Sequence, residues 1–149
     1  MKIYDPICYT VSVEINLSAE KVFRYLSDPE KLGRWALGCF NTQSAGKEGL
    51  YKGISLFDGS ETWVRIEADV KRLIIDYHVG DSDHQVPRIS TRVMPGPAYG
   101  SDSTHCIVSM MAWRTKDMSD SRWHRLCVSH EAEILMIRSQ IESQSDPES

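Results

Sequence analysis

The sequence predicts one α+β domain in which a curved antiparallel β-sheet, two short helices and a long C-terminal helix enclose a cavity. Three observations support this prediction. A segment near the N-terminus alternates between apolar and polar residues, the middle of the chain consists of short strand-like runs separated by turn residues, and the C-terminal segment carries one apolar helical stripe.

Length and composition are those of an ordinary globular domain. The chain has 149 residues, of which 41% are apolar and 26% charged, and a chain of this size buries roughly two thirds of its unfolded surface. No internal repeat or Pro/Gly/Ser-rich linker divides it. We therefore expect a single domain over residues 1–143 and a disordered tail over residues 144–149.

The charge pattern excludes several classes of partner. The formal net charge is -4 and the basic residues are scattered, so we expect no nucleic-acid partner. No apolar stretch approaches the roughly 20 residues that span a bilayer, and the N-terminal residues lack the layout of a signal peptide. A cytoplasmic protein without a membrane span is the expectation, and the oligomeric state stays open.

The cysteines do not indicate a metal site or a disulfide. Cys8, Cys39, Cys106 and Cys127 are far apart and form no CxxC pair, whereas zinc sites usually need paired ligands. His124, Cys127 and Glu131 have helical spacing that permits three ligands on one edge, but no second ligand cluster accompanies them. We predict no metal and no cofactor.

The N-terminal elements follow from periodicity and capping. Residues 7–16 alternate with the period of a strand that has one buried face. Ser18 is a suitable N-cap for a first helix, and Glu20 complements its dipole. Asp28 and Pro29 then begin a second short helix, which we expect to end near Gly38.

The middle of the chain predicts an antiparallel meander. Strand-like runs cover residues 60–68, 72–79, 88–94 and 104–114, and Asp58-Gly59 is a strong hairpin signal. Short connections favour antiparallel pairing, because parallel strands need long crossovers. Residues 95–103 form a longer connection that could be the lip of an opening.

The C-terminal segment predicts a long amphipathic helix after Ser119. One stripe of mostly apolar residues recurs along it at steps of three and four. Its members are Trp123, Leu126, Cys127, His130, Ile134, Ile137 and Ile141. Such a helix must lie on an apolar surface, and only the sheet is large enough.

The segment VSVEINLSAEKVFRYLSDPEKLGRW, residues 11–35, leaves a strand, forms two helices and ends on a tryptophan. It resembles the entry segment of the START/Bet v 1-like (SRPBCC) superfamily, which includes polyketide cyclase/dehydrase-like proteins. The element order resembles that superfamily over nearly the whole chain. The resemblance implies a helix-grip fold around a cavity. It implies no catalytic motif, because members range from lipid carriers to aromatase/cyclases and chaperone activators.

His130 is the leading candidate site residue because it interrupts the apolar stripe at its middle. A buried imidazole needs a hydrogen-bond partner, which could be a backbone carbonyl, a side chain, a water or a ligand. Tyr77 shares an apolar strand face with Leu73, Ile75 and Val79 and offers one hydroxyl there. Core packing explains either residue as readily as a ligand contact does.

Further residues complete the predicted ligand set. The full set is His130, Tyr77, Trp123, Cys127, Ile134, Met111 and Ile75. Both faces of residues 104–114 are mostly apolar, so the inward face of that strand is undetermined. Alternation places Arg88 and Arg92 on a solvated face, and likewise Asp76 and His78.

These features favour binding of a small hydrophobic or aromatic molecule in the cavity. The alternative is a cofactor-free cyclase, dehydratase or lyase acting on an aromatic or polyketide-like substrate, with His130 and Tyr77 as acid/base and oxyanion-stabilising groups. A protein-interaction module is a third class and would require an exposed apolar patch.

Overall fold

The computed structural model describes residues 3–144. The predicted tail lies outside the described residues except for Gln144, whose backbone ends the last helix. In chain order the elements are β1 (Cys8–Ile15), α1 (Ala19–Leu26), α2 (Pro29–Leu32), β2 (Phe40–Ser44), β3 (Leu50–Ile54), β4 (Glu61–Asp69), β5 (Ile74–Gly80), β6 (Gln85–Pro95), the 3-10 helix η1 (Gly96–Tyr99), β7 (Cys106–Trp113) and α3 (Asp120–Gln144).

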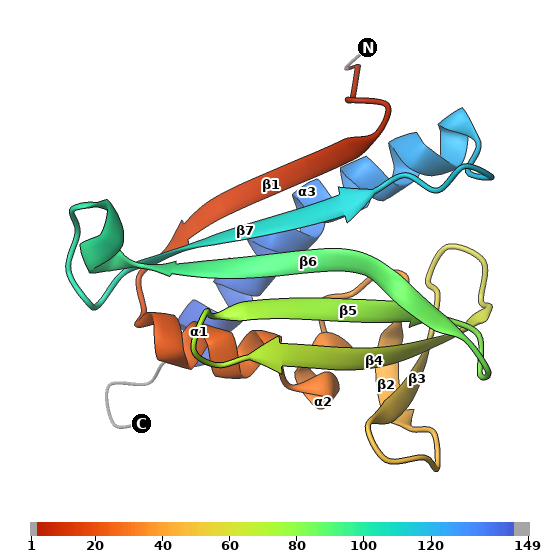
Figure 1. The fold of residues 1–149 in the computed structure, drawn as a ribbon, viewed down its shortest axis with the longest axis horizontal. Helices are drawn as coiled ribbons and strands as arrows, with labels where there is room; N and C mark the ends of the chain where they lie inside the picture. Colours follow the sequence, from red (N-terminus) through yellow and green to blue (C-terminus); the bar gives the residue numbers. More distant parts are fainter. Residues whose placement is uncertain (1–2, 145–149) are drawn as a thin grey trace.

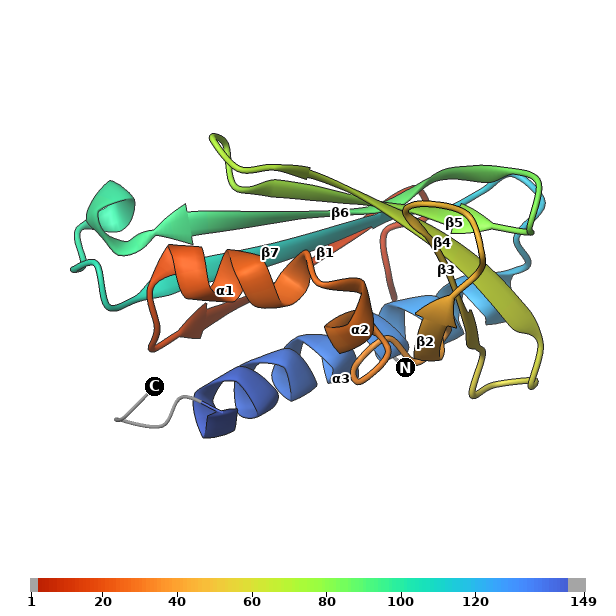
Figure 2. The ribbon, with the colours of Figure 1, turned by 90° about the horizontal axis from the view of Figure 1, so that it is seen from below.

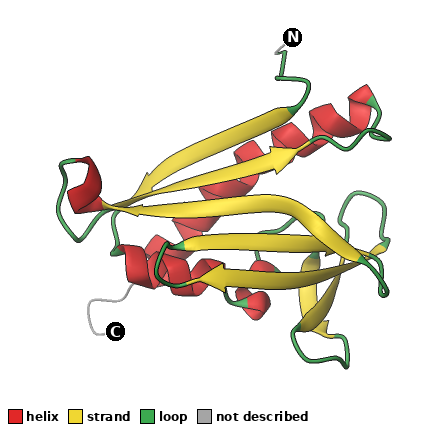
Figure 3. Cartoon of the chain, viewed as in Figure 1, coloured by secondary structure: helices red, strands yellow, loops and turns green. Residues whose placement is uncertain are grey.

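The strands form one sheet in the order β1-β7-β6-β5-β4-β3-β2 (Figure 1). Every neighbouring pair is antiparallel. The predicted meander is thus confirmed, and β1 closes it by pairing with β7. The sheet twists and curves over α1, α2 and α3, which lie on its concave side, while η1 lies beyond the end of β6 (Figures 2 and 3).

Local sequence explains where the first helices begin. The side chain of Ser18 accepts a hydrogen bond from the Lys21 N–H, and that of Asp28 accepts one from the Glu30 N–H. Both N-caps were predicted from residue type. The second helix ends at Leu32, earlier than predicted, and turns carry the chain on to β2.

The structure shows which side chains of β5 and β7 point toward the helices. On β5 the side chains of Ile75 and Tyr77 are buried, as alternation predicted. On β7 the inward residues are Cys106, Val108, Met110 and Ala112, while Met111 is 37% exposed on the outer face. The sequence left this choice open because both faces are mostly apolar.

The main core lies between the sheet, α1 and the C-terminal half of α3. Its members come from all three; they include Ile15, Val22, Phe23, Leu26, Val108, Ile134, Ile137 and Ile141. Helix α1 lies between the sheet and α3 (Figure 2). No helix in residues 3–144 is long and apolar enough to cross a membrane.

Candidate functional site

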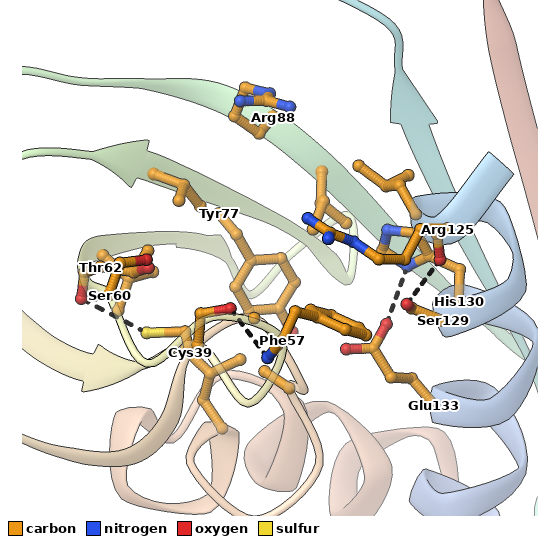
Figure 4. Close-up of a pocket in the computed structure, with 18 of the residues that line it drawn as sticks. Cys39, Phe57, Ser60, Thr62, Tyr77, Arg88, Arg125, Ser129, His130 and Glu133 are labelled. Atoms are coloured by element: carbon orange, nitrogen blue, oxygen red, sulfur yellow. Dashed lines mark hydrogen bonds and ion pairs between the residues drawn. The ribbon is translucent and has the colours of Figure 1, made fainter. Parts of the chain in front are cut away.

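A cavity of about 280 Å³ lies between the N-terminal half of α3, the segment after α2 and strands β4 to β6 (Figure 4). Its apolar lining comes from Leu32, Trp35, Ala36, Val64, Tyr77, Val79, Ile89, Met118 and Leu126. Its polar lining includes Ser55, Asp58, Ser60, Thr62, Arg88, Arg122, Arg125, Ser129, His130 and Glu133. The polar groups come from β4, β6, α3 and the loop between β3 and β4.

Tyr77 and Trp35 form an aromatic wall of the cavity. Their ring centroids lie 5.8 Å apart and the rings meet edge to face at 80°. The Tyr77 hydroxyl donates a hydrogen bond to the Leu26 carbonyl at 2.7 Å, and burial raises its pKa. Its only proton is therefore engaged with the backbone, so Tyr77 offers a ligand its ring and has no free O–H to donate.

His130 pairs with Glu133, one helical turn further along α3. The His130 Nδ1 lies 3.2 Å from the Glu133 Oε1, and the Leu37 N–H donates to the Glu133 Oε2 at 2.8 Å. The His130 Nδ1 also lies 2.9 Å from the Met110 sulfur. Both side chains of the pair are buried, and both residues line the cavity.

Burial makes both members of this pair neutral at neutral pH. It raises the pKa of Glu133 to about 8, against the opposing effect of the Leu37 N–H. Burial, assisted by the positive charge of Arg88, lowers the pKa of His130 to about 4. At neutral pH the contact is therefore a close approach of two neutral groups and not an ion pair.

Sequence reasoning missed Glu133. It stood at the margin of the apolar stripe, where a glutamate usually faces solvent. The signal that could have found it is its i, i+3 spacing from the one polar residue within the stripe, since such pairs are neighbours on a helix. The His130 Nδ1 therefore faces Glu133 of its own helix and Met110 of β7.

Arg88 also departs from the expectation of a solvated face. Tyr77 pairs with Ile89 whereas the next residue, His78, pairs with Pro87, so Arg88 is the extra residue of a β-bulge. A bulge re-aims the side chain it carries, and proline within a sheet is confined to edges and bulges. Arg88 consequently lines the cavity, and its Nε is buried without a hydrogen-bond partner in the described part of the chain.

The remaining rim comes from α3 and the loop after β3. The Arg125 guanidinium lies 4.7 Å from the centroid of the Phe57 ring, a cation–π arrangement across the rim (Figure 4). Asp58 accepts hydrogen bonds from the backbone and the side chain of Ser60, which fixes the turn beside them.

Among the residues predicted to contact a ligand, only His130 and Tyr77 line this cavity. Trp123 and Cys127 pack in a second apolar cluster with Met118, and the Trp123 indole donates to the Asp5 carbonyl. Ile134 and Ile75 belong to the main core.

Met111, the last member of that set, lies outside the cavity because it points away from the helices. The apolar stripe of α3 runs along the whole helix, whereas the cavity borders only part of it. A position on the stripe therefore does not show that a residue lines the cavity.

The acidic and sulfur-containing side chains do not converge on a metal position. In residues 3–144 no group of three His, Cys, Asp or Glu side chains could hold a metal ion. Glu131 instead accepts hydrogen bonds from the hydroxyls of Tyr4 and Tyr9, which tie the N-terminal segment to α3.

Comparison with known proteins identifies the fold. No protein-family model and no curated protein matches the sequence. The structure is similar to the Zhui aromatase/cyclase from Streptomyces sp. R1128, with 12% identity and a TM-score of 0.68 over 95% of this chain and 97% of that one.

Two further solved structures show the same arrangement. A START superfamily protein from Mycobacterium smegmatis is 11% identical, with a TM-score of 0.68 over 93% of this chain and 99% of that one. XoxI from Bacillus cereus is 14% identical, with a TM-score of 0.70 over 93% and 98%. The chain therefore has the helix-grip fold that these structures share, among them a START superfamily protein.

Proposed function

We propose that the protein binds a small, largely apolar organic molecule in the cavity beneath the N-terminal half of α3. The observation that carries this proposal is a cavity of about 280 Å³ that combines an aromatic wall with a few polar groups. Ligand pockets span roughly 300–1,000 Å³, so the volume suits a compact molecule of one or two rings.

The lining supports a ligand with an apolar body and a polar end. The edge-to-face rings of Trp35 and Tyr77 provide an aromatic surface, which Val64 and Val79 extend. The polar groups gather on the α3 side and at the rim. Pockets that bind small molecules combine an apolar lining with a few polar groups that fix orientation.

Filling the cavity tests the proposal. Ser129 lines the cavity and its hydroxyl donates only to the Arg125 carbonyl of its own helix, so Ser129→Phe places a ring in the space a ligand would occupy. Val128 is the adjacent, exposed residue, and Val128→Phe is the matched control. Both variants should keep the native circular dichroism spectrum.

The measurement is calorimetric titration with naphthalene-, phenyl- and octyl-bearing probes. We expect native protein and Val128→Phe to bind at least one probe class, and Ser129→Phe to lose at least about tenfold in affinity. Equal affinity in Ser129→Phe would place binding elsewhere, and absence of binding to native protein would contradict the proposed function.

A second candidate, cofactor-free acid/base catalysis, is favoured by the His130–Glu133 pair. A carboxyl group with a pKa of about 8 is protonated at neutral pH and can serve as a general acid near its working pH. His130 would relay the proton through Nδ1. Tyr77 is not part of this mechanism, because its proton is donated to Leu26.

Dehydration of an aromatic β-hydroxy ketone, followed by absorbance, tests this candidate. An enzyme should lose at least about a hundredfold in rate in Glu133→Gln and keep its rate in Glu20→Gln, which changes an exposed residue of α1. A ligand that binds without being converted by native protein would leave binding as the function.

A further inference from the structure

The cavity rim carries a concentration of positive charge in an acidic protein. Arg88 approaches from the bulge of β6, while Arg122 and Arg125 lie three residues apart on one face of α3, and all of them line the cavity. The whole chain has a net charge of -4. The positive rim is therefore a local feature and does not follow from overall composition.

These three guanidinium groups have few acidic neighbours within residues 3–143. None of them forms an ion pair with a described carboxylate. Asp58 and Asp117 are the acidic groups near them, Asp58 close to Arg125 and Asp117 close to both other arginines. The arginines outnumber these carboxylates by one. Glu133, with a pKa of about 8, adds no negative charge at neutral pH.

Unsatisfied donors provide a second, independent observation. The Arg88 Nε and the indole nitrogen of Trp35 are buried and have no hydrogen-bond partner in the described residues. Trp35 is 1% exposed and lines the same cavity. Both groups are donors without an acceptor of their own. Buried donors are nearly always paired in native structures, so we expect an acceptor atom of a ligand beside Arg88 and a ligand acceptor or a water beside the Trp35 indole.

We propose that the polar end of the ligand is a carboxylate held by Arg88, with Arg122 and Arg125 around it, and that the apolar body lies against Trp35 and Tyr77. The inference rests on the proposed function and names its ligand class. A guanidinium is planar and matches the two oxygens of a carboxylate, so it holds the group in a fixed direction. The single excess positive charge matches a monoanion better than a phosphate dianion.

Paired acids and amides test the proposal, because they differ in charge while keeping nearly the same shape. The probes are naphthalene carboxylate, phenylpropanoate and octanoate, each compared with its amide and, for naphthalene, with naphthyl phosphate. We expect native protein to bind the preferred acid at least about tenfold more tightly than its amide, since hydrogen bonds to charged groups are the strong ones. Added salt should reduce that ratio.

Two variants test whether the preference for acids over amides depends on Arg88. Arg88→Gln should reduce the acid-to-amide ratio to about one while leaving amide affinity unchanged, which also shows that the variant is folded. Arg92→Gln is the matched control, because Arg92 lies on the same strand but is exposed on the outer side of the sheet. It should keep the full ratio.

Different results separate the two proposals. Equal binding of acid and amide by native protein would overturn the carboxylate site and leave the binding function intact. If Arg92→Gln also lost the acid-to-amide affinity ratio, the preference for the acid would come from the overall electrostatic field of the protein. That result would overturn the assignment to Arg88. Tighter binding of naphthyl phosphate would overturn the choice of carboxylate. No binding of any probe would overturn both proposals.

Discussion

The two halves of α3 meet the same sheet in different ways. In the C-terminal half, Ile134, Ile137 and Ile141 pack into a continuous core that contains much of α1. In the N-terminal half, Arg125, Ser129 and His130 face a cavity. One regular helix therefore contributes to a packed interior at one end and to a polar-walled space at the other.

Helix α1 accounts for the difference. It lies against the sheet and beneath the C-terminal half of α3 (Figure 2), where Tyr25 hydrogen-bonds to Gln140. Under the other half of α3, the cavity lies between the helix, the segment after α2 and strands β4 to β6. A single helix cannot fill a curved sheet, so the position of α1 determines where the cavity can form.

The largest expected effect comes from truncating the packed half. Ile137 is fully buried, so Ile137→Ala should lower the free energy of unfolding by about 3 kcal/mol, through lost burial and a new cavity. Leu126→Ala, in the half that already borders a cavity, should lower it by only about 1 kcal/mol. Urea unfolding followed by circular dichroism measures both, and equal losses would mean that the halves are packed alike.

The buried carboxyl group of the cavity half should give a pH-dependent stability. The pKa of Glu133 rises from 4.5 to about 8 on folding, so its contribution to the free energy of unfolding falls as pH rises between those values. The pKa of His130 falls from 6.5 to about 4, so its contribution increases with pH only up to 6.5. Well above that pH, Glu133 is the member of this pair that still changes stability.

We therefore expect native protein to lose about 1–2 kcal/mol between pH 6.5 and 8 because of Glu133. Glu133→Gln can still accept from the Leu37 N–H, and it should lack this loss because its side chain does not ionise. Urea unfolding at both pH values provides the comparison. The same pH dependence in both proteins would show that Glu133 is already ionised at neutral pH.

A smaller effect is expected at the rim of the cavity. Phe57 is 42% exposed and its ring lies beneath the Arg125 guanidinium. Phe57→Ala should change the free energy of unfolding by less than about 1 kcal/mol, while bound probe should dissociate a few-fold faster. Stopped-flow displacement measures the rate. An unchanged dissociation rate would mean that ligand exchange does not pass this side of the rim.

The outer face of the sheet should give the smallest effect. Met111 is on that face, so Met111→Ser should leave probe affinity unchanged and alter stability by no more than about 0.5 kcal/mol. Titration and urea unfolding check both values. A marked loss of affinity would indicate binding on the outer face.

Local patterns were sufficient to predict most of the helices and strands, and the orientation of β5 and α3. Alternation predicted the inward face of β5, the residue types of Ser18 and Asp28 predicted two N-caps, and the helical stripe predicted α3. His130 was singled out because one polar residue interrupts an apolar stripe, and it does line the cavity.

The parts that were missed depend on contacts distant in sequence. The inward turn of Arg88 arises from a register shift against β5, which the alternation of β6 alone cannot reveal. Ile134 lies on the same helical stripe as His130, which lines the cavity. Ile134 is nevertheless buried in the main core, because α1 packs between the sheet and that half of α3. In the sequence, Glu133 looks like a solvent-facing residue. Its burial depends on the hydrogen bond from the Leu37 N–H, which is distant in sequence.

The most direct test of the account is a crystal structure of the native protein with its preferred naphthalene carboxylate. We predict density for the rings between Trp35, Tyr77 and the N-terminal half of α3, with the carboxylate within hydrogen-bonding distance of Arg88. Density on the outer face of the sheet, or beneath the C-terminal half of α3, would contradict the central claim that the space left open by α1 is the binding site.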